Sequence, residues 1–208
     1  MKYLKFIASL LLFFVITEEA VAQNKITPDT IRTYKEIGDT NLKLHIFYPT
    51  KINNKQPTAA IVFFFGGGWT GGNPNQFYQQ SQYLASRGIL AISAEYRIKN
   101  THKTTPFESV EDGKSAIRWV RANAEELHID PNKIIASGGS AGGHIAVCTA
   151  LIEGNEQKGE DVTISAVPNA VVAYNPVLDT TEKGYGSEKV KGRETEISPT
   201  QGPEQRLI

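Results

Sequence analysis

Cysteine is almost absent from this chain, because Cys148 is the single one among 208 residues. An intramolecular disulfide is therefore excluded. Cys148 stands among apolar residues of an expected helix, without a basic neighbour close in sequence, so we expect a buried and unreactive thiol. An excess of charge is also lacking, since 22 Lys and Arg balance 22 Asp and Glu. The chain thus has no net field to attract nucleic acid or anionic lipid, and we expect neither as a partner.

An apolar run long enough to cross a membrane is lacking as well. The run from Phe6 to Ile16 follows two lysines and is shorter than the about 20 residues that a spanning helix needs. Small residues at Ala20-Val21-Ala22 then match a cleavage site, so residues 1–22 are predicted to be a secretory signal peptide cut after Ala22. We expect a secreted or periplasmic protein without a stable membrane anchor after cleavage, in which residues 23–208 form one domain.

Apolar runs and helical patterns alternate along the middle of the chain. Continuous apolar runs, typical of strands covered on both faces, predict strands at 59–65, 89–94, 133–136 and 170–174. Helices are expected between them at 76–87, 106–127 and 141–152. An antiparallel pair at 32–37 and 42–48 precedes them. This order predicts an α/β fold whose mostly parallel sheet carries helices on both faces and an antiparallel N-terminal strand pair.

A serine stands in a glycine-rich turn between a predicted strand and a predicted helix, in Gly138-Gly139-Ser140-Ala141-Gly142. Glycines two positions either side of the serine let the strand and the helix pass close together, while the turn lifts the hydroxyl out of the backbone. The following helix N-terminus favours the negative charge of a tetrahedral intermediate. Ser140 is therefore the predicted nucleophile of an acyl transfer. A plain glycine turn that contains a serine is the structural alternative.

A second glycine motif, Phe65-Gly66-Gly67-Gly68-Trp69, follows a predicted buried strand. Backbone N–H groups of such a loop can pair with the N–H of the residue after the nucleophile to form an oxyanion hole. Gly67, Gly68 and Ala141 are the candidate donors. A flexible surface turn is the alternative, but two glycine motifs at the ends of neighbouring strands favour a shared site.

The same loop also matches a dinucleotide-binding pattern. Gly66, Gly68 and Gly71 have the spacing G-x-G-x-x-G, and Glu95 stands about where a ribose-binding acid is expected. Pro74 argues against this reading, because it delays the helix whose N-terminus should receive the pyrophosphate. A dinucleotide site is therefore a remote alternative.

Five segments together resemble the bacterial α/β-hydrolase esterases and lipases akin to the hormone-sensitive lipase and polysaccharide-esterase groups. These segments are Phe65–Trp69, Glu95–Arg97, Ser115–Arg121, Asp130–Ile134 and Gly138–His144. The resemblance spans residues 42–179 and implies an α/β-hydrolase fold and a serine carboxylesterase that uses no metal or cofactor. It also implies short acyl, acetyl or feruloyl esters as substrates, small or borne by plant polysaccharides.

Two departures from this family pattern stand out. Phe65 replaces the histidine that usually begins the first glycine loop and supports it. The members also continue through further strands that deliver an acid and then a histidine, whereas here no histidine follows His144 and the sequence ends at Ile208. We therefore expect the C-terminal strands of the fold to be missing and the chain to be C-terminally incomplete. A catalytically incompetent fragment, or a non-catalytic binding relative, is accordingly the second hypothesis.

The catalytic acid and base are unknown from the sequence. Asp179, after the last predicted strand, and His102, on a loop at the active-site edge of the sheet, are weak candidates. His144 is expected to serve in packing, and surface roles suffice for the remaining histidines at 45 and 128. Glu95 and Arg97 end a strand near the same edge, where internal ion pairing accounts for them.

Overall fold

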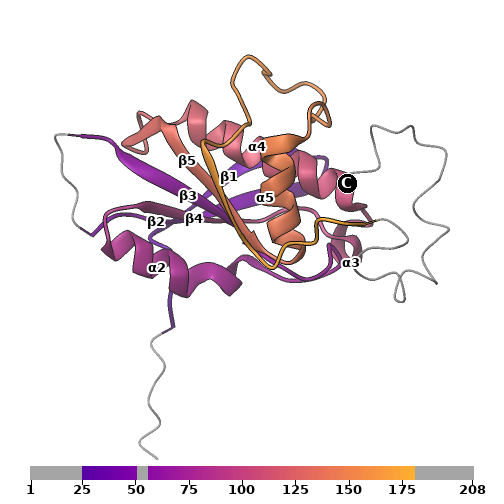
Figure 1. Ribbon diagram of the computed structural model, residues 1–208, viewed down its shortest axis with the longest axis horizontal. Coiled ribbons are helices and arrows are strands. Elements are labelled where there is room, and N and C mark those ends of the chain that lie inside the picture. Colours follow the sequence, from indigo (N-terminus) through magenta and orange to yellow (C-terminus); the bar gives the residue numbers. More distant parts are fainter. Residues whose placement is uncertain (1–24, 51–55, 181–208) are drawn as a thin grey trace, which may run out of the picture.

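The structure is a computed structural model that describes residues 25–50 and 56–180 (Figure 1). The predicted signal peptide, residues 1–22, lies outside the described residues. Within the described ranges, no helix combines the length and apolar character required to cross a membrane.

Six strands form one sheet in the order β1-β2-β4-β3-β5-β6. They are β1 (Thr30–Ile37), β2 (Thr40–Phe47), β3 (Thr58–Phe64), β4 (Leu90–Ala94), β5 (Ile129–Gly139) and β6 (Ala170–Tyr174). The first two strands pair antiparallel around Gly38, and β2 pairs antiparallel with β4. The remaining neighbours, β4 with β3, β3 with β5 and β5 with β6, pair in parallel. The predicted mixed sheet with its antiparallel N-terminal pair is confirmed.

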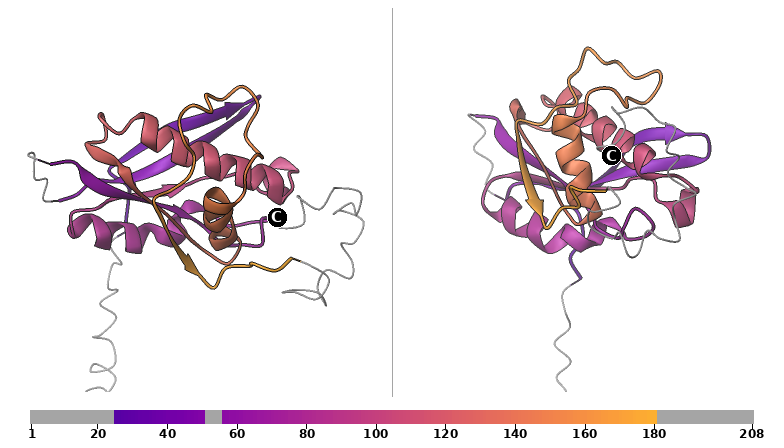
Figure 2. Two further views of the ribbon diagram at one scale, coloured as in Figure 1. Left: turned by 45° about the horizontal axis from the view of Figure 1, so that its top comes forward. Right: turned by 45° about the vertical axis from the view of Figure 1, so that its right-hand side comes forward.

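Helices cover both faces of this sheet, as predicted. They are η1 (Pro74–Phe77), α2 (Tyr78–Ser86), α3 (Lys99–His102), α4 (Pro106–Ala122) and α5 (Ala141–Leu151). Two views show α2 on one face of the sheet and α4 with α5 on the other (Figures 1 and 2). Parallel strands need crossover connections, and these helices supply them.

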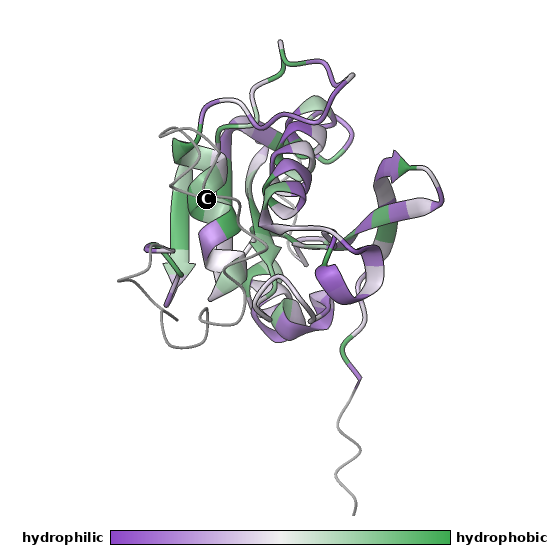
Figure 3. Cartoon of the chain, turned by 90° about the vertical axis from the view of Figure 1, so that its right-hand side faces the viewer, coloured by the Kyte–Doolittle hydropathy of each residue, from purple (hydrophilic) through white to green (hydrophobic). Residues whose placement is uncertain are grey.

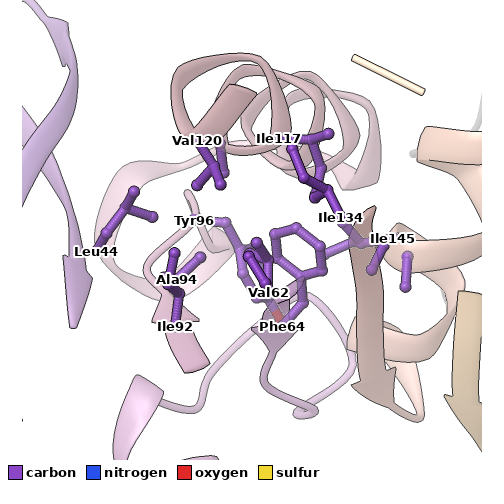
Figure 4. Packing of buried hydrophobic residues seen from close by; sticks show 14 of the residues in the cluster. Leu44, Val62, Phe64, Ile92, Ala94, Tyr96, Ile117, Val120, Ile134 and Ile145 are labelled. Carbon is purple, nitrogen blue, oxygen red and sulfur yellow. The ribbon is translucent and has the colours of Figure 1, made fainter. Parts of the chain in front are cut away.

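The central strand β3 is buried on both faces, which explains its continuous apolar sequence. Val62 and Phe64 belong to the larger core beneath α4 and α5, together with Ile117 and Ile145 (Figure 4). The alternate residue Phe63 belongs to the smaller core on the α2 side, where its ring stacks on that of Phe77 at 4.8 Å between centroids. The sheet is therefore sandwiched between two apolar layers, and its carboxyl edge carries the glycine loops.

Short sequence signals predicted where the helices begin and end. Thr105 and Glu108 form the predicted capping box at the start of α4, where Glu108 Oε2 accepts the Thr105 N–H at 2.8 Å. Gly88, with φ of 90°, follows the end of α2 as expected. The predicted helix to residue 127 is too long, because α4 ends at Ala122 and continues as turns in which Leu127 is nevertheless buried.

The strand β5 begins earlier than predicted, at Ile129. Asp130 Oδ1 accepts the Asn132 N–H at 2.9 Å, so the expected turn does form. It forms inside the strand, where the register against β3 shifts between Thr58 and Ala60. The irregularity lets the strand absorb the turn residues and still reach the glycine elbow.

Three charged side chains, those of Lys35, Arg97 and Asp112, are buried where α4 packs on the sheet. Asp112 is fully buried and contacts Lys35 Nζ at 2.7 Å and Arg97 Nε at 2.8 Å. Arg97 also reaches Glu111 at 3.0 Å. The expected internal ion pairing of Arg97 is present, but its partners are on α4, and Glu95 pairs elsewhere.

Apolar residues are unevenly distributed over the molecule. Hydropathy colouring is most apolar around α5 and its neighbouring strands, whereas the β1–β2 hairpin mixes polar and apolar positions (Figure 3). Two residues of β6, Val172 and Tyr174, are 44% and 50% exposed. The edge strand β6, which follows the serine elbow in the sheet, therefore exposes apolar side chains.

Candidate active site

Ser140 occupies the sharp turn between β5 and α5. Its backbone has φ of 54° and ψ of −120°, a conformation that side-chain-bearing residues rarely adopt. The residue is exposed, although Gly138 before it and Ala141 after it are buried. The Ser140 N–H donates to the Tyr174 carbonyl of β6 at 2.9 Å, and the Ser140 carbonyl accepts the His144 N–H at 3.0 Å. The turn is thus fixed on both sides while its hydroxyl lies at the surface.

Glycines are needed around this serine because backbone passes backbone there. A Cβ atom on Gly142 would lie closer than 3.0 Å to the carbonyl oxygens of Phe64 and Phe65. A Cβ on Gly138 would meet Phe64 O and the Gly142 backbone equally closely. The elbow therefore packs directly on the end of β3, where the second glycine loop begins.

The loop after β3 reaches the serine itself. A Cβ on Gly66 would lie 3.4 Å from the Ser140 Cβ and 2.9 Å from the Gly139 carbonyl oxygen. Gly67 and Gly68 follow with φ of 136° and 61°, which glycine adopts at low cost. The Gly67 carbonyl accepts the N–H groups of Thr70 at 3.1 Å and Gly71 at 3.2 Å, which closes the loop on itself.

The candidate oxyanion donors lie in two segments next to Ser140. Ala141 follows the serine in the chain, and Gly67 and Gly68 belong to the loop that packs against it. Ala141 is the first residue of α5, so its N–H has no partner within the helix. Over the described residues, the N–H groups of Gly67 and Gly68 also donate to no other backbone group. Three N–H groups are therefore available at the edge of the sheet where Ser140 stands.

Comparisons with known proteins identify the family of this chain. Residues 44–198 match the BD-FAE family model. The chain belongs to the BD-FAE family. It is therefore one of the α/β-hydrolase esterases, as the resemblance predicted.

Relatives of this BD-FAE chain include proteins named as esterases. Carboxylesterase NlhH of Mycobacterium tuberculosis is 31% identical over 123 residues, which cover 58% of this chain and 37% of that protein. Esterase 2 of Thermogutta terrifontis with butyrate bound is 43% identical with a TM-score of 0.74, covering 83% of this chain and 63% of that one. The same esterase phosphonylated by cyclosarin is 46% identical with a TM-score of 0.72, covering 74% and 59%. The chain spans about three fifths of these solved chains and less than two fifths of NlhH.

In this BD-FAE chain, other contacts hold the glycine loop where the family histidine is replaced by Phe65. The Phe65 ring stacks on Tyr96 with centroids 4.1 Å apart, and the Tyr96 hydroxyl donates to the Phe65 carbonyl at 2.7 Å. Gln76 Oε1 accepts the Gly66 N–H at 2.6 Å. Sequence reasoning missed Tyr96 and Gln76 as supports of the loop. The replaced histidine was the signal that such supports are needed.

A short helix that was not predicted, α3, holds the other end of the loop. The N–H groups of Lys99 and Asn100 donate to the carbonyls of Trp69 and Thr70 at 2.9 and 3.2 Å. The candidate base His102 lies at the end of this helix rather than on an open loop. Its Nδ1 accepts the Ile98 N–H at 2.9 Å, and among the described residues no hydrogen bond joins it to Ser140.

The remaining histidines have other surroundings. His144 is buried beneath Trp69, and desolvation lowers its pKa to about 4. Its ring nitrogens lie 3.5 and 3.7 Å from Cys148 Sγ, and burial raises the pKa of that thiol to about 12, in line with the predicted unreactive cysteine. His128 is exposed.

The surface role expected for His45 is wrong. The residue is 8% exposed, and its Nε2 lies 3.1 Å from Glu95 Oε1 while its Nδ1 lies 2.7 Å from the Tyr78 hydroxyl. Strand alternation placed His45 opposite the apolar face of β2, but α2 covers that face as well. Because β2 is buried on both faces rather than on one, His45 is buried and not at the surface.

Asp179, the weak candidate for the acid, lies exposed beyond β6. Among the described residues, no group of three or more His, Cys, Asp or Glu side chains is arranged to hold a metal ion. The position of the next α-helix disfavours the dinucleotide alternative. Helix α2 begins only at Tyr78, well after Gly71, so its N-terminus does not fall within the glycine motif where a pyrophosphate would bind.

Proposed function

We propose that this chain provides the nucleophile and the oxyanion hole of a serine carboxylic-ester hydrolase, which acts through an acyl-enzyme on Ser140. One observation supports this role above the others: an exposed serine in a strained strand-to-helix turn, against Gly66 of a loop whose neighbouring N–H groups are available. Strained backbone of this kind collects at functional sites. Membership of an esterase family supports the same reaction.

The reaction follows from these positions. Ser140 Oγ attacks the carbonyl carbon of the ester, its proton passes to a base, and the carbonyl π electrons move onto oxygen. N–H groups of Gly67, Gly68 and Ala141 stabilise that oxyanion, which then re-forms the carbonyl and expels the protonated alcohol. Water hydrolyses the acyl-enzyme and restores the serine. His102 is disfavoured as that base, because its Nδ1 lone pair already accepts the Ile98 N–H.

Short acyl groups are the proposed substrates. The related esterase 2 of Thermogutta terrifontis was solved with butyrate bound, which supports a short acyl chain here. Acetyl or feruloyl esters, including those carried by plant polysaccharides, are the finer proposal drawn from the family resemblance.

We further propose export to the periplasm or medium after cleavage behind Ala22. N-terminal sequencing of the mature protein would test this by finding Gln23 first.

Trapping the acyl-enzyme tests the nucleophile directly. The chain is incubated with p-nitrophenyl butyrate, and peptides are analysed by mass spectrometry. We expect a butyryl adduct on the peptide that contains Ser140, with release of nitrophenol. Ser140→Ala should remove both signals, whereas the matched control Ser86→Ala, an exposed serine on α2, should retain them. Equal release of nitrophenol by Ser140→Ala and the unaltered chain would reject the proposal.

A non-catalytic binding role is the second candidate. It is favoured by one observation: among the described residues no imidazole or carboxylate forms a hydrogen bond with the Ser140 side chain. On this hypothesis butyrate or its ester binds without an adduct and without nitrophenol release. On the hydrolase hypothesis, turnover of p-nitrophenyl acetate by the chain as given is expected to be slow, because catalysis without a positioned base retains only part of the rate enhancement.

A further inference from the structure

The segment that follows β6 holds the backbone of Ser140 from two sides. The carbonyl of Tyr174, the last residue of β6, accepts the Ser140 N–H at 2.9 Å, and the Val177 N–H donates to the Ser140 carbonyl at 3.4 Å. Pro176 packs on the helix behind the serine, because a Cβ on Gly143 would lie 3.0 Å from the Pro176 Cβ. Both backbone polar groups of the nucleophile are therefore bonded to one short segment.

These bonds bear on the strain at Ser140. The serine has φ of 54° and ψ of −120°, which a side-chain-bearing residue keeps only where its surroundings fix it. The bond to Tyr174 fixes the peptide before the serine, and the bond from Val177 supports the peptide after it. The position of the hydroxyl thus depends on the segment that supplies these two partners.

Asn175 sets the course of this segment through its own backbone. Its φ is 44°, in the left-handed region that residues other than glycine, Asn and Asp rarely adopt. This conformation comes directly after the extended strand and turns the chain back, so that Val177 reaches the serine from which β6 had led away. The two bonds to Ser140 therefore lie on either side of one left-handed residue.

The side chain of Asn175 is not what holds the segment. It is exposed, and it forms no hydrogen bond with any other residue in the ranges 25–50 and 56–180. Its contribution is the tolerance of Asn for a left-handed backbone, which glycine shares and β-branched residues lack.

We propose that Asn175 is a positioning residue for the nucleophile, because its left-handed backbone keeps the Tyr174 carbonyl and the Val177 N–H on Ser140. The inference rests on the proposed function, since it gives Asn175 a part in the reaction of Ser140 without a contact to the ester. A residue that leaves the left-handed region would pull one of the two bonds away. The strained turn could then relax, and the hydroxyl would spend less time in the attacking position.

Two replacements separate the backbone of Asn175 from its side chain. Asn175→Gly removes the side chain and keeps the left-handed conformation, whereas Asn175→Val disfavours that conformation. We expect Asn175→Val to form the butyryl adduct on Ser140 about tenfold more slowly at saturating p-nitrophenyl butyrate, the size of effect that left-handed strain can impose. Asn175→Gly should react as fast as the unaltered chain. The ester concentration for half-maximal rate should be the same in all three chains, as expected for a residue that does not contact the ester.

A second asparagine of this chain provides the matched control. Asn155 also has a left-handed backbone, with φ of 50°, and its side chain donates to the Phe107 carbonyl at 3.0 Å. It follows the C-terminal end of α5, whereas Ser140 precedes the N-terminal end of that helix. Asn155→Val therefore introduces the same kind of strain at a distance from the serine. It should lower the melting temperature and leave the rate of adduct formation unchanged.

Hydrogen exchange of the Ser140 amide tests the same inference without any ester. The N–H that donates to Tyr174 should exchange about tenfold faster in folded Asn175→Val, and at an unchanged rate in Asn175→Gly and Asn155→Val. Thermal melts establish that each variant is folded, and Asn175→Ala takes the place of Asn175→Val if the latter does not fold.

Equal adduct rates and equal exchange in Asn175→Val and the unaltered chain would overturn the proposal. A loss in Asn175→Gly as large as that in Asn175→Val would also overturn it, because the side chain would then be responsible. Absence of any adduct in the unaltered chain would reject the proposed function instead, and the exchange rates would still decide whether Asn175 positions the serine.

Discussion

Trp69 and His144 meet edge to face, with ring centroids 5.1 Å apart and an angle of 87° between their planes. Trp69 belongs to the glycine loop after β3, and His144 to the first turns of the helix that starts behind Ser140. Trp69 adopts φ of 57°. The indole N–H of Trp69 is buried without a hydrogen-bond partner among the described residues. The contact therefore joins the two halves of the site through packing rather than through a hydrogen bond.

Burial of His144 predicts acid sensitivity. The pKa of His144 is about 4 in the folded chain, against about 6.5 when it is exposed, so unfolding takes up a proton between these values. The free energy of unfolding should fall by about 3 kcal/mol as pH drops from 6.5 to 4. Urea unfolding across this range measures the slope. His144→Phe should remove this part of the slope, and exposed His128→Asn should not. An unchanged slope in His144→Phe would contradict the assignment.

The close approach of the two glycine loops predicts that Gly142→Ala is strongly destabilising. The new methyl group would overlap the carbonyl oxygens of Phe64 and Phe65, which cannot move without shifting β3. We expect a loss of about 2 kcal/mol or more in unfolding free energy. Gly71→Ala is the control, because the nearest atom to its Cβ is 4.0 Å away. Thermal melts of the two variants should differ clearly; similar melting temperatures would refute the packing argument.

Strain at Ser140 predicts an unusual gain on replacement by glycine. Ser140→Gly and Ser140→Ala both remove the hydroxyl, but only glycine adopts φ of 54° and ψ of −120° without strain. Strain of this kind costs about 1–3 kcal/mol, and the greater freedom of glycine in the unfolded chain offsets part of the relief. Ser140→Gly should therefore be about 1 kcal/mol more stable than Ser140→Ala in chemical denaturation. A less stable glycine variant would argue for a relaxed turn.

Removal of one charge from the buried ion pairs should be costly. Asp112→Asn would leave Lys35 and Arg97 facing each other without their shared carboxylate. Breaking such a buried pair typically costs about 3–5 kcal/mol. Glu126→Gln breaks only the exposed pair with Arg32, for which about 0–1 kcal/mol is expected. Parallel urea titrations compare the two, and equal losses would mean that the Asp112 pairs are effectively solvated.

Local sequence patterns predicted most of the strands and helices. They failed where an element depends on contacts with residues far away in the sequence. The apolar runs marked β3, β4, β5 and β6, and the Thr105 capping box marked α4, because both signals lie within a few residues. The short α3 has no such signal, since its stability comes from bonds to the glycine loop. The extension of β5 through Asp130 depends on pairing with β3, which a turn signal cannot reveal.

Only the backbone arrangement of the candidate site could be predicted from the sequence. The spacing of Gly138 and Gly142 placed Ser140 in a turn whose geometry the structure now describes. Contacts of Glu95 and His45 were not foreseeable, because 50 residues separate these partners and no local pattern couples them. The same holds for Arg97 and Asp112, whose pairing depends on how α4 crosses the sheet.

The contact between Gly142 and the end of β3 also bears on how this chain can change in evolution. Neither glycine loop can acquire a side chain at the crossing point without displacing the other, so each single substitution there is expected to disturb both loops. A change at this crossing point therefore cannot alter one half of the site alone, because the backbone of the other half would have to move with it.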